Sequence, residues 1–222
     1  MVMRNKTVKV QVSLDFLSID KALEVGKVAS RAGADWIEAG TPLITFQGVK
    51  AIEAVSEEFP DKIIVADYKA LDGVAKYVKE AARRGAHIAT VAAVAANASI
   101  RQGVRAARES GIEVCADLYA ICNPAQRARE LEQIGVDYVM IHLGADEKSE
   151  NPARDPLEGL FDVVKAVNIP VGVVVFTIDE ATEAIRQGAR FIVVGHPLLS
   201  SENLAKVLSN FIKIVKEVAA AR

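Results

Sequence analysis

The sequence contains no run of about 18 consecutive apolar residues, the length that a membrane-spanning helix needs. Aromatic residues make up only 5% of its 222 residues, which argues against a platform on which nucleic-acid bases stack. Lys and Arg together number 27 against 29 Asp and Glu, so there is no basic excess to attract a nucleic-acid backbone or an acidic membrane surface. We therefore expect a protein that binds neither nucleic acid nor membrane.

Cysteine is also scarce, since Cys115 and Cys122 are the only two and their spacing fits neither a disulfide framework nor a zinc site. We expect one buried small residue and one thiol in a loop. The first 15 residues, MVMRNKTVKVQVSLD, alternate polar and apolar residues without the apolar core of a signal peptide, so they predict a first strand. These features favour a cytoplasmic, reducing setting.

What the sequence does contain is a regular alternation of short β-branched runs and longer amphipathic segments. The runs predict strands at 8–14, 36–39, 62–67, 87–92, 113–118, 138–142, 170–175 and 191–195. The segments between them predict helices near 19–31, 46–58, 73–84, 97–109, 124–134, 156–167, 179–187 and 201–219. Ser18, Asn97 and Asn123 are the expected N-caps of three of these helices.

This alternation predicts a parallel sheet covered by helices. Eight strand–helix units in a chain of this length fit one α/β domain over residues 1–222, a single (β/α)8 TIM barrel. The alternative is a doubly wound open sheet. That fold normally uses fewer units and a glycine-rich first turn, whereas the segment after the first strand, LDFLSID, has no glycine.

Charged residues gather at the carboxyl ends of the otherwise apolar strands. They are Asp15, Glu38, Asp67, Lys69, Asp117 and His142. In a barrel these strand ends meet at one mouth, where active sites lie. Because buried charges are costly unless they are paired or bound to a cation, the pattern predicts a polar site for a charged ligand or a divalent cation.

Taken singly, most of these residues have a simpler structural explanation. Asp15 could be an acid in the first turn of a helix, and His142 could be a hydrogen-bonded core histidine. Asp67 and Lys69 lie two positions apart and so share one face of a strand, where they could form only an ion pair. Glu38, inside an apolar strand, is the hardest to explain by packing alone.

The D-x-K-x-x-D spacing of Asp67, Lys69 and Asp72 changes this balance, because it carries a resemblance to a known family. Companion segments are LD at 14–15, IEAGTPLI at 37–44, ADL at 116–118 and GVDYVMIHLGAD at 135–146. With them, nearly the whole chain resembles the orotidine monophosphate decarboxylase superfamily. Within it, the chain resembles the group of 3-hexulose-6-phosphate synthase and 3-keto-L-gulonate-6-phosphate decarboxylase. The ADL segment and NPAQRARELEQIGVDYV are more similar to the synthase branch.

The resemblance implies magnesium-dependent chemistry through a Mg-stabilised enediolate of a sugar phosphate. It implies that Glu38 and Asp67 hold Mg²⁺, for which hard carboxylate oxygens are suitable ligands. Lys69 would add positive charge, and His142 would be the acid/base group because imidazole titrates near neutrality. Asp72 is similar to the residue that family members insert into the neighbouring subunit, which implies a homodimer with shared active sites.

The phosphate end departs from the family's pattern. Family members usually have paired glycines after the seventh strand and Gly-Gly or Gly-Arg after the eighth, where backbone N–H groups bind the phosphate. Here Val175 and Phe176 replace the first pair. After the eighth strand Gly195 and His196 are followed by Pro197, which has no N–H to donate.

Two explanations of this departure are open: the phosphate is held differently, or the ligand is not the family's usual sugar phosphate. For the first, a protonated His196 and the Thr177 hydroxyl would be the donors. We predict that an anion would lie near Gly195 and His196 and not against Phe176. The predicted substrate-binding residues are thus Asp15, Asp117, Thr177, Gly195 and His196.

The preferred interpretation is a magnesium-dependent aldehyde-lyase resembling 3-hexulose-6-phosphate synthase. It would interconvert formaldehyde plus ribulose 5-phosphate with hexulose 6-phosphate. A decarboxylase of a keto-sugar-acid phosphate is the close alternative, and a sugar-phosphate isomerase or epimerase is a more distant one. A non-catalytic binding or regulatory barrel would account for the altered phosphate end, but not for charged residues that packing does not require.

Overall fold

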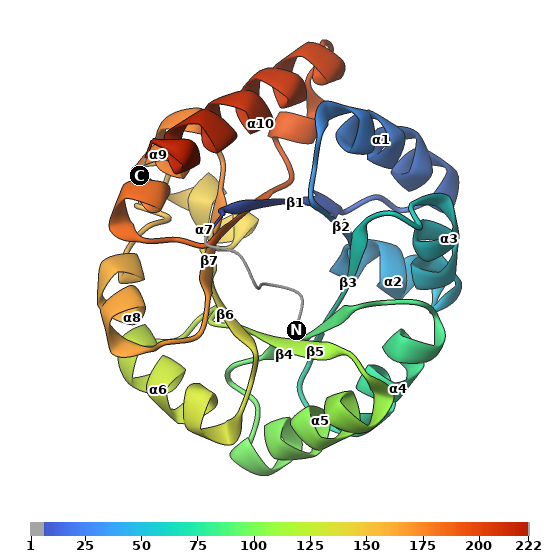
Figure 1. Ribbon diagram of the computed structural model, residues 1–222, viewed down its shortest axis with the longest axis vertical. Coiled ribbons are helices and arrows are strands. Elements are labelled where there is room, and N and C mark those ends of the chain that lie inside the picture. The colour runs from blue at the N-terminus through green and yellow to red at the C-terminus, as the bar shows by residue number, and fades with distance from the viewer. Residues whose placement is uncertain (1–6, 222) are drawn as a thin grey trace.

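Eight parallel strands close into a barrel in which each strand pairs with the next along the chain and β8 pairs with β1 (Figure 1). This computed structural model describes residues 7–221. The strands are β1 (Lys9–Leu14), β2 (Trp36–Ala39), β3 (Ile63–Ala70), β4 (Ile88–Ala92), β5 (Glu113–Asp117), β6 (Tyr138–Ile141), β7 (Val171–Val175) and β8 (Phe191–Val194). The predicted barrel is confirmed, and the open-sheet alternative is wrong.

Helices form an outer ring around this barrel (Figure 1). They are α1 (Ile19–Ala32), α2 (Thr41–Gln47), α3 (Lys50–Glu58), α4 (Val74–Arg83), α5 (Asn97–Ser110), α6 (Pro124–Ile134), α7 (Ala145–Glu150), α8 (Leu160–Ala166), α9 (Ile178–Gln187), the 3₁₀ turn η1 (Leu198–Ser200) and α10 (Leu204–Ala220). Among the residues described, no helix is both long and apolar enough to span a bilayer.

The helix boundaries follow local capping, and they differ from the sequence prediction in several places. The helix expected at 46–58 is two helices, α2 and α3, because Gly48 takes a positive φ of 70° between them. The short helix α7 was not predicted. Ser18 and Asn123 cap α1 and α6 as expected, but Asn97 is the first residue of α5 and makes no cap.

Two apolar layers hold the barrel together. The larger one lies between the strands and the surrounding helices. The smaller one fills the barrel interior and consists of Trp36, Val65, Ile88, Cys115, Tyr138, Met140, Phe191 and Val193. We call this group the interior plug. Its three aromatic rings pack with centroids 5.2–5.9 Å apart, so the interior is closed below the mouth.

Candidate active site

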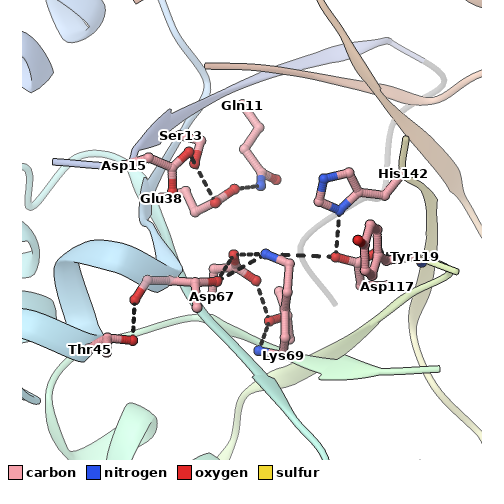
Figure 2. Close-up of polar contacts among 12 residues, drawn as sticks. Gln11, Ser13, Asp15, Glu38, Thr45, Asp67, Lys69, Asp117, Tyr119 and His142 are labelled. Carbon is pink, nitrogen blue, oxygen red and sulfur yellow. Dashed lines mark hydrogen bonds and ion pairs between the residues drawn. The ribbon is translucent and has the colours of Figure 1, made fainter. Parts of the chain in front are cut away.

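Polar side chains from the carboxyl ends of the strands converge on one mouth of the barrel (Figure 2). Since alternate residues of a strand share a face, the plug residues Trp36, Val65 and Met140 are each followed two positions later by a residue of the mouth: Glu38, Asp67 and His142. A cavity of about 100 Å³ opens there. It is lined by Ser13, Asp15, Glu38, Asp67, Lys69, Met140, His142, Leu143, Ala145, Val174, Phe176, Val193, Gly195 and His196.

Glu38 lies on β2 at the floor of this cavity and is only 4% exposed. Ser13, its register partner on β1, donates its hydroxyl to Glu38 Oε1 at 2.6 Å, and the buried Gln11 amide donates to Oε2. Burial raises the pKa of Glu38 to about 8, and the negative charges of Asp67 and Asp15 add to the effect. A second positive charge in this mouth would therefore be strongly favoured.

Asp67 on β3 is also buried but has the opposite electrostatic environment. The Thr90 hydroxyl donates to its Oδ1 at 2.6 Å, and the Thr41 hydroxyl donates to its Oδ2 at 2.5 Å. The Lys69 ammonium donates to the same Oδ2 and forms an ion pair with it. Burial opposes ionisation, but the Lys69 charge and these hydrogen bonds outweigh it and lower the pKa of Asp67.

Lys69 reaches Asp67 through an irregularity in β3. The pairing of β3 with β4 shifts register between Ala66 and Ala70, and Lys69 has a φ of 45°, which L residues rarely adopt. The backbone N–H of Lys69 donates to the Thr90 hydroxyl at 2.9 Å. Although burial works against the ammonium, Asp67 and Asp117 raise the pKa of Lys69 above its usual range, so this side chain is a permanent cation.

His142 follows β6 and is held by a buried carboxylate. Its Nδ1 lies 2.8 Å from Oδ2 of Asp117, which is 1% exposed on β5. The same Oδ2 is 3.8 Å from Lys69 Nζ. Because the ionised carboxylate accepts the Nδ1 proton, Nε2 is the ring nitrogen left to exchange protons with a ligand.

The phosphate end is arranged differently from a backbone anion cradle. At the start of α9, the N–H groups of Phe176 and Thr177 donate to the Glu180 carboxylate at 2.7 and 3.0 Å. The Thr177 hydroxyl accepts from the Glu180 N–H at 3.2 Å, so Thr177 caps this helix and does not line the cavity. These donors are thus occupied by the chain's own carboxylate.

Most predicted site residues are brought together, and a few are not. Asp15, Glu38, Asp67, Lys69, His142, Gly195 and His196 line the cavity, and Asp117 supports it. Asp72 lies outside the cavity of its own chain, exposed after β3, where the Ser99 hydroxyl donates to it at 3.3 Å. The Asp72 side chain is therefore accessible to a second protein chain.

The sequence analysis missed several polar residues of the mouth. They are Gln11, Ser13, Thr41, Thr90 and Tyr119. Gln11 and Ser13 had a usable signal, since they alternate with apolar residues on the way to Asp15 and so had to face inward. The two threonines had none, because a threonine is an ordinary strand or helix-start residue.

Three acidic side chains, those of Asp15, Glu38 and Asp67, line this mouth beside one permanent cation, Lys69. Among residues 7–221, no three His, Cys, Asp or Glu side chains are close enough to hold a metal ion by themselves. The arrangement can hold a ligand oxygen beside Lys69, and it can move a proton at His142 Nε2.

Comparisons with known proteins identify a matching family and similar folds. Residues 8–211 match the orotidine 5'-phosphate decarboxylase / HUMPS family. The 3-hexulose-6-phosphate synthase of Mycobacterium gastri is 38% identical over 192 residues, which cover 84% of this chain and 89% of that protein. A crystal structure of a 3-hexulose-6-phosphate synthase superposes with a TM-score of 0.87 at 31% identity, over 95% of this chain and 99% of the other.

A structure of 3-keto-L-gulonate-6-phosphate decarboxylase from Vibrio cholerae O1 biovar El Tor superposes with a TM-score of 0.80. It covers 93% of this chain and 98% of the other, at 23% identity. At that identity the likeness shows the fold alone.

Proposed function

The chain belongs to the orotidine 5'-phosphate decarboxylase / HUMPS family, and from that premise we propose that it is an aldehyde-lyase. It would join formaldehyde to ribulose 5-phosphate and give a hexulose 6-phosphate. The observation that carries this proposal is the connected set of Asp67, Lys69, Asp117 and His142 at the barrel mouth. The higher identity to named synthases than to the decarboxylase structure favours the aldol reaction over decarboxylation.

The chain's residues divide the chemistry between a cation and a proton carrier. His142 Nε2 takes the proton from C1, beside the ketone, and Lys69 offsets the negative charge that develops on the substrate oxygens. The electron pair at C1 then forms the new bond to the formaldehyde carbon, and the π electrons of its C=O group move to the oxygen. His142 donates the proton that this oxygen needs, while Asp117 keeps its Nδ1 protonated.

The family resemblance implies Mg²⁺, and the chemistry of the residues at the mouth supports it. Mg²⁺ is usually held by one or two carboxylates, waters and substrate oxygens, so it does not need three protein ligands. Glu38 and Asp67 would hold it. Burial, and then the charges of Asp67 and Asp15, raise the pKa of Glu38 and so disfavour its ionised carboxylate. A bound divalent cation would stabilise that carboxylate. When bound, Mg²⁺ would supply positive charge for the developing negative charge on the substrate oxygens.

A homodimer with shared active sites is part of the proposal. Asp72 is exposed beside Leu71, whose side chain is 57% exposed, and Val94 on the neighbouring loop is 55% exposed. Burial of such apolar side chains favours association. Mixing Asp72→Asn chains with Lys69→Ala chains should restore part of the activity through complementary half-sites. A fully active monomer in ultracentrifugation would contradict the shared site.

The decisive experiment follows formaldehyde consumption with ribulose 5-phosphate and Mg²⁺, beside decarboxylation of 3-keto-L-gulonate 6-phosphate. Formaldehyde consumption that EDTA abolishes and Mg²⁺ restores is expected. Release of CO₂ without formaldehyde consumption would favour the decarboxylase. Activity that persists in EDTA would contradict the requirement for Mg²⁺. The absence of binding to any phosphorylated sugar would contradict the proposal that the substrate is a sugar phosphate.

The cysteines agree with the sequence prediction as far as the structure describes them. Cys115 is buried in the interior plug, Cys122 is exposed, and both are free. The reducing, cytoplasmic location stays a prediction.

A further inference from the structure

An aromatic ring that the proposed chemistry does not use lies against the acid/base histidine. Tyr119 is in the loop between β5 and α6, and its ring centroid is 5.4 Å from that of His142 (Figure 2). The Tyr119 backbone N–H donates to Asp117 Oδ1 at 2.9 Å, while Asp117 Oδ2 holds His142. One buried carboxylate thus positions both the histidine and the residue that covers it.

The Tyr119 ring also packs on Gly144, at the start of α7. A Cβ atom added to Gly144 would lie 2.6 Å from Cε2 of Tyr119. Gly144 has a φ of −65°, which any residue adopts, so the need for glycine comes from the ring and not from the backbone. Ala120, next to the ring, has a φ of 58°, a conformation that L residues rarely take. The position of the ring is therefore set by two segments, the loop after β5 and the start of α7.

His142, against which the ring lies, lines two cavities of different size. The cavity at the mouth has a volume of about 100 Å³, and the second has a volume of about 550 Å³. Leu143 also lines both, and Leu118 and Ala120, the neighbours of Tyr119 in the chain, line the second. Space for a larger ligand thus exists next to His142, bordered by the residues on either side of Tyr119 in the chain.

We propose that the Tyr119 ring limits the size of the aldehyde that the enzyme accepts. The inference rests on the proposed function, in which the aldehyde oxygen receives its proton from His142 and must therefore lie beside it. Formaldehyde carries only hydrogen on its carbonyl carbon. Any larger aldehyde places a substituent beside His142, whose ring centroid is 5.4 Å from that of Tyr119.

The test compares formaldehyde with glycolaldehyde as acceptors for ribulose 5-phosphate. Tyr119→Ala should raise the ratio of kcat/KM for glycolaldehyde to that for formaldehyde by about tenfold or more, the discrimination that a pocket achieves for a small added group. Gly144→Ala should raise the ratio in the same direction by displacing the ring. Tyr119→Phe should leave the ratio unchanged, since the ring remains.

Phe161→Ala is the matched control, because Phe161 is a similarly exposed ring on α8 that lies against the Lys165 ammonium instead of against His142. An unchanged ratio in both Tyr119→Ala and Gly144→Ala would overturn the inference, as would an equal rise in Phe161→Ala. If the wild-type enzyme consumes formaldehyde but the variants do not change the ratio of the two kcat/KM values, the size limit is contradicted and the proposed function is not. A wild type that uses neither aldehyde would contradict that function and, with it, the size limit.

Discussion

The lower and upper levels of the barrel interior are made by the same strands but have different roles. The lower level packs apolar side chains, and the upper level holds charged ones. On β2, Trp36 belongs to the interior plug and Glu38, two residues later, belongs to the mouth. Val65 and Asp67 repeat this step on β3. A shift of about 7 Å along a strand therefore changes the interior from apolar packing to interacting charges. Stability and chemistry are separated by level and not by element.

The unfavourable electrostatic interactions of the barrel interior lie in the mouth and not in the plug. In the plug every side chain is neutral and closely packed, so each contributes to burial. In the mouth, burial raises the pKa of Glu38 to about 8, whereas Lys69 keeps Asp67 ionised. A layer that exists only for packing would not place these groups together, since unpaired buried charge destabilises a fold. Four variants test this separation.

Glu38→Gln should have the largest effect, and on activity alone. The rate should fall by about 10³-fold or more, because a carboxylate proposed to hold the cation is lost. The free energy of unfolding should change by only about 1 kcal/mol, since a pKa of about 8 already makes the uncharged acid the main form at neutral pH without a cation. Steady-state kinetics and urea unfolding measure the two quantities. Retained activity would contradict the role of Glu38 in the mouth.

Trp36→Ala should have the next largest effect, and on stability. Removing this ring leaves a cavity between Tyr138 and Phe191, which should lower the free energy of unfolding by about 3–5 kcal/mol. Thermal unfolding followed by circular dichroism measures the loss. Phe161→Ala is the control, and its exposed ring should cost about 0.5 kcal/mol or less. Equal losses in both variants would refute the view of the plug as the stabilising layer.

Asp117→Asn should lower kcat by about 10²-fold with a small change in KM. An amide that donates to His142 Nδ1 would favour the tautomer with its proton on Nε2. The pH profile of kcat is the diagnostic measurement, because a residue with only a packing role would lower activity equally at every pH. A parallel drop across the profile would count against the positioning role of Asp117.

His196→Ala should have the smallest effect, and it should depend on pH. A protonated imidazole attracts phosphate, so sugar-phosphate binding in the wild type should weaken as the pH is raised from acidic to alkaline. The variant should bind about tenfold more weakly at the acidic end and lose this pH dependence. Calorimetric titrations at acidic and alkaline pH measure the affinities. Affinity that is independent of pH in both proteins would move the phosphate away from His196.

Much of the fold and part of the site are readable from the sequence by itself. Short apolar runs separated by amphipathic segments have two different periods, and these periods depend only on local backbone geometry. They identify the strands and therefore the strand ends. Asp15, Glu38, Asp67, Lys69 and His142 were found in this way, because charged residues at the ends of buried strands have few purely structural explanations.

Only the tertiary structure decided how these residues are supported and covered. Thr41 and Thr90 reach Asp67 across 26 and 23 positions in sequence, and the irregular pairing of β3 turns Lys69 toward the same carboxylate. The closure of Tyr119 onto Gly144 depends on two loops from neighbouring strands. Such contacts are set by the register of paired strands and by barrel closure, which are long-range properties that no local period encodes.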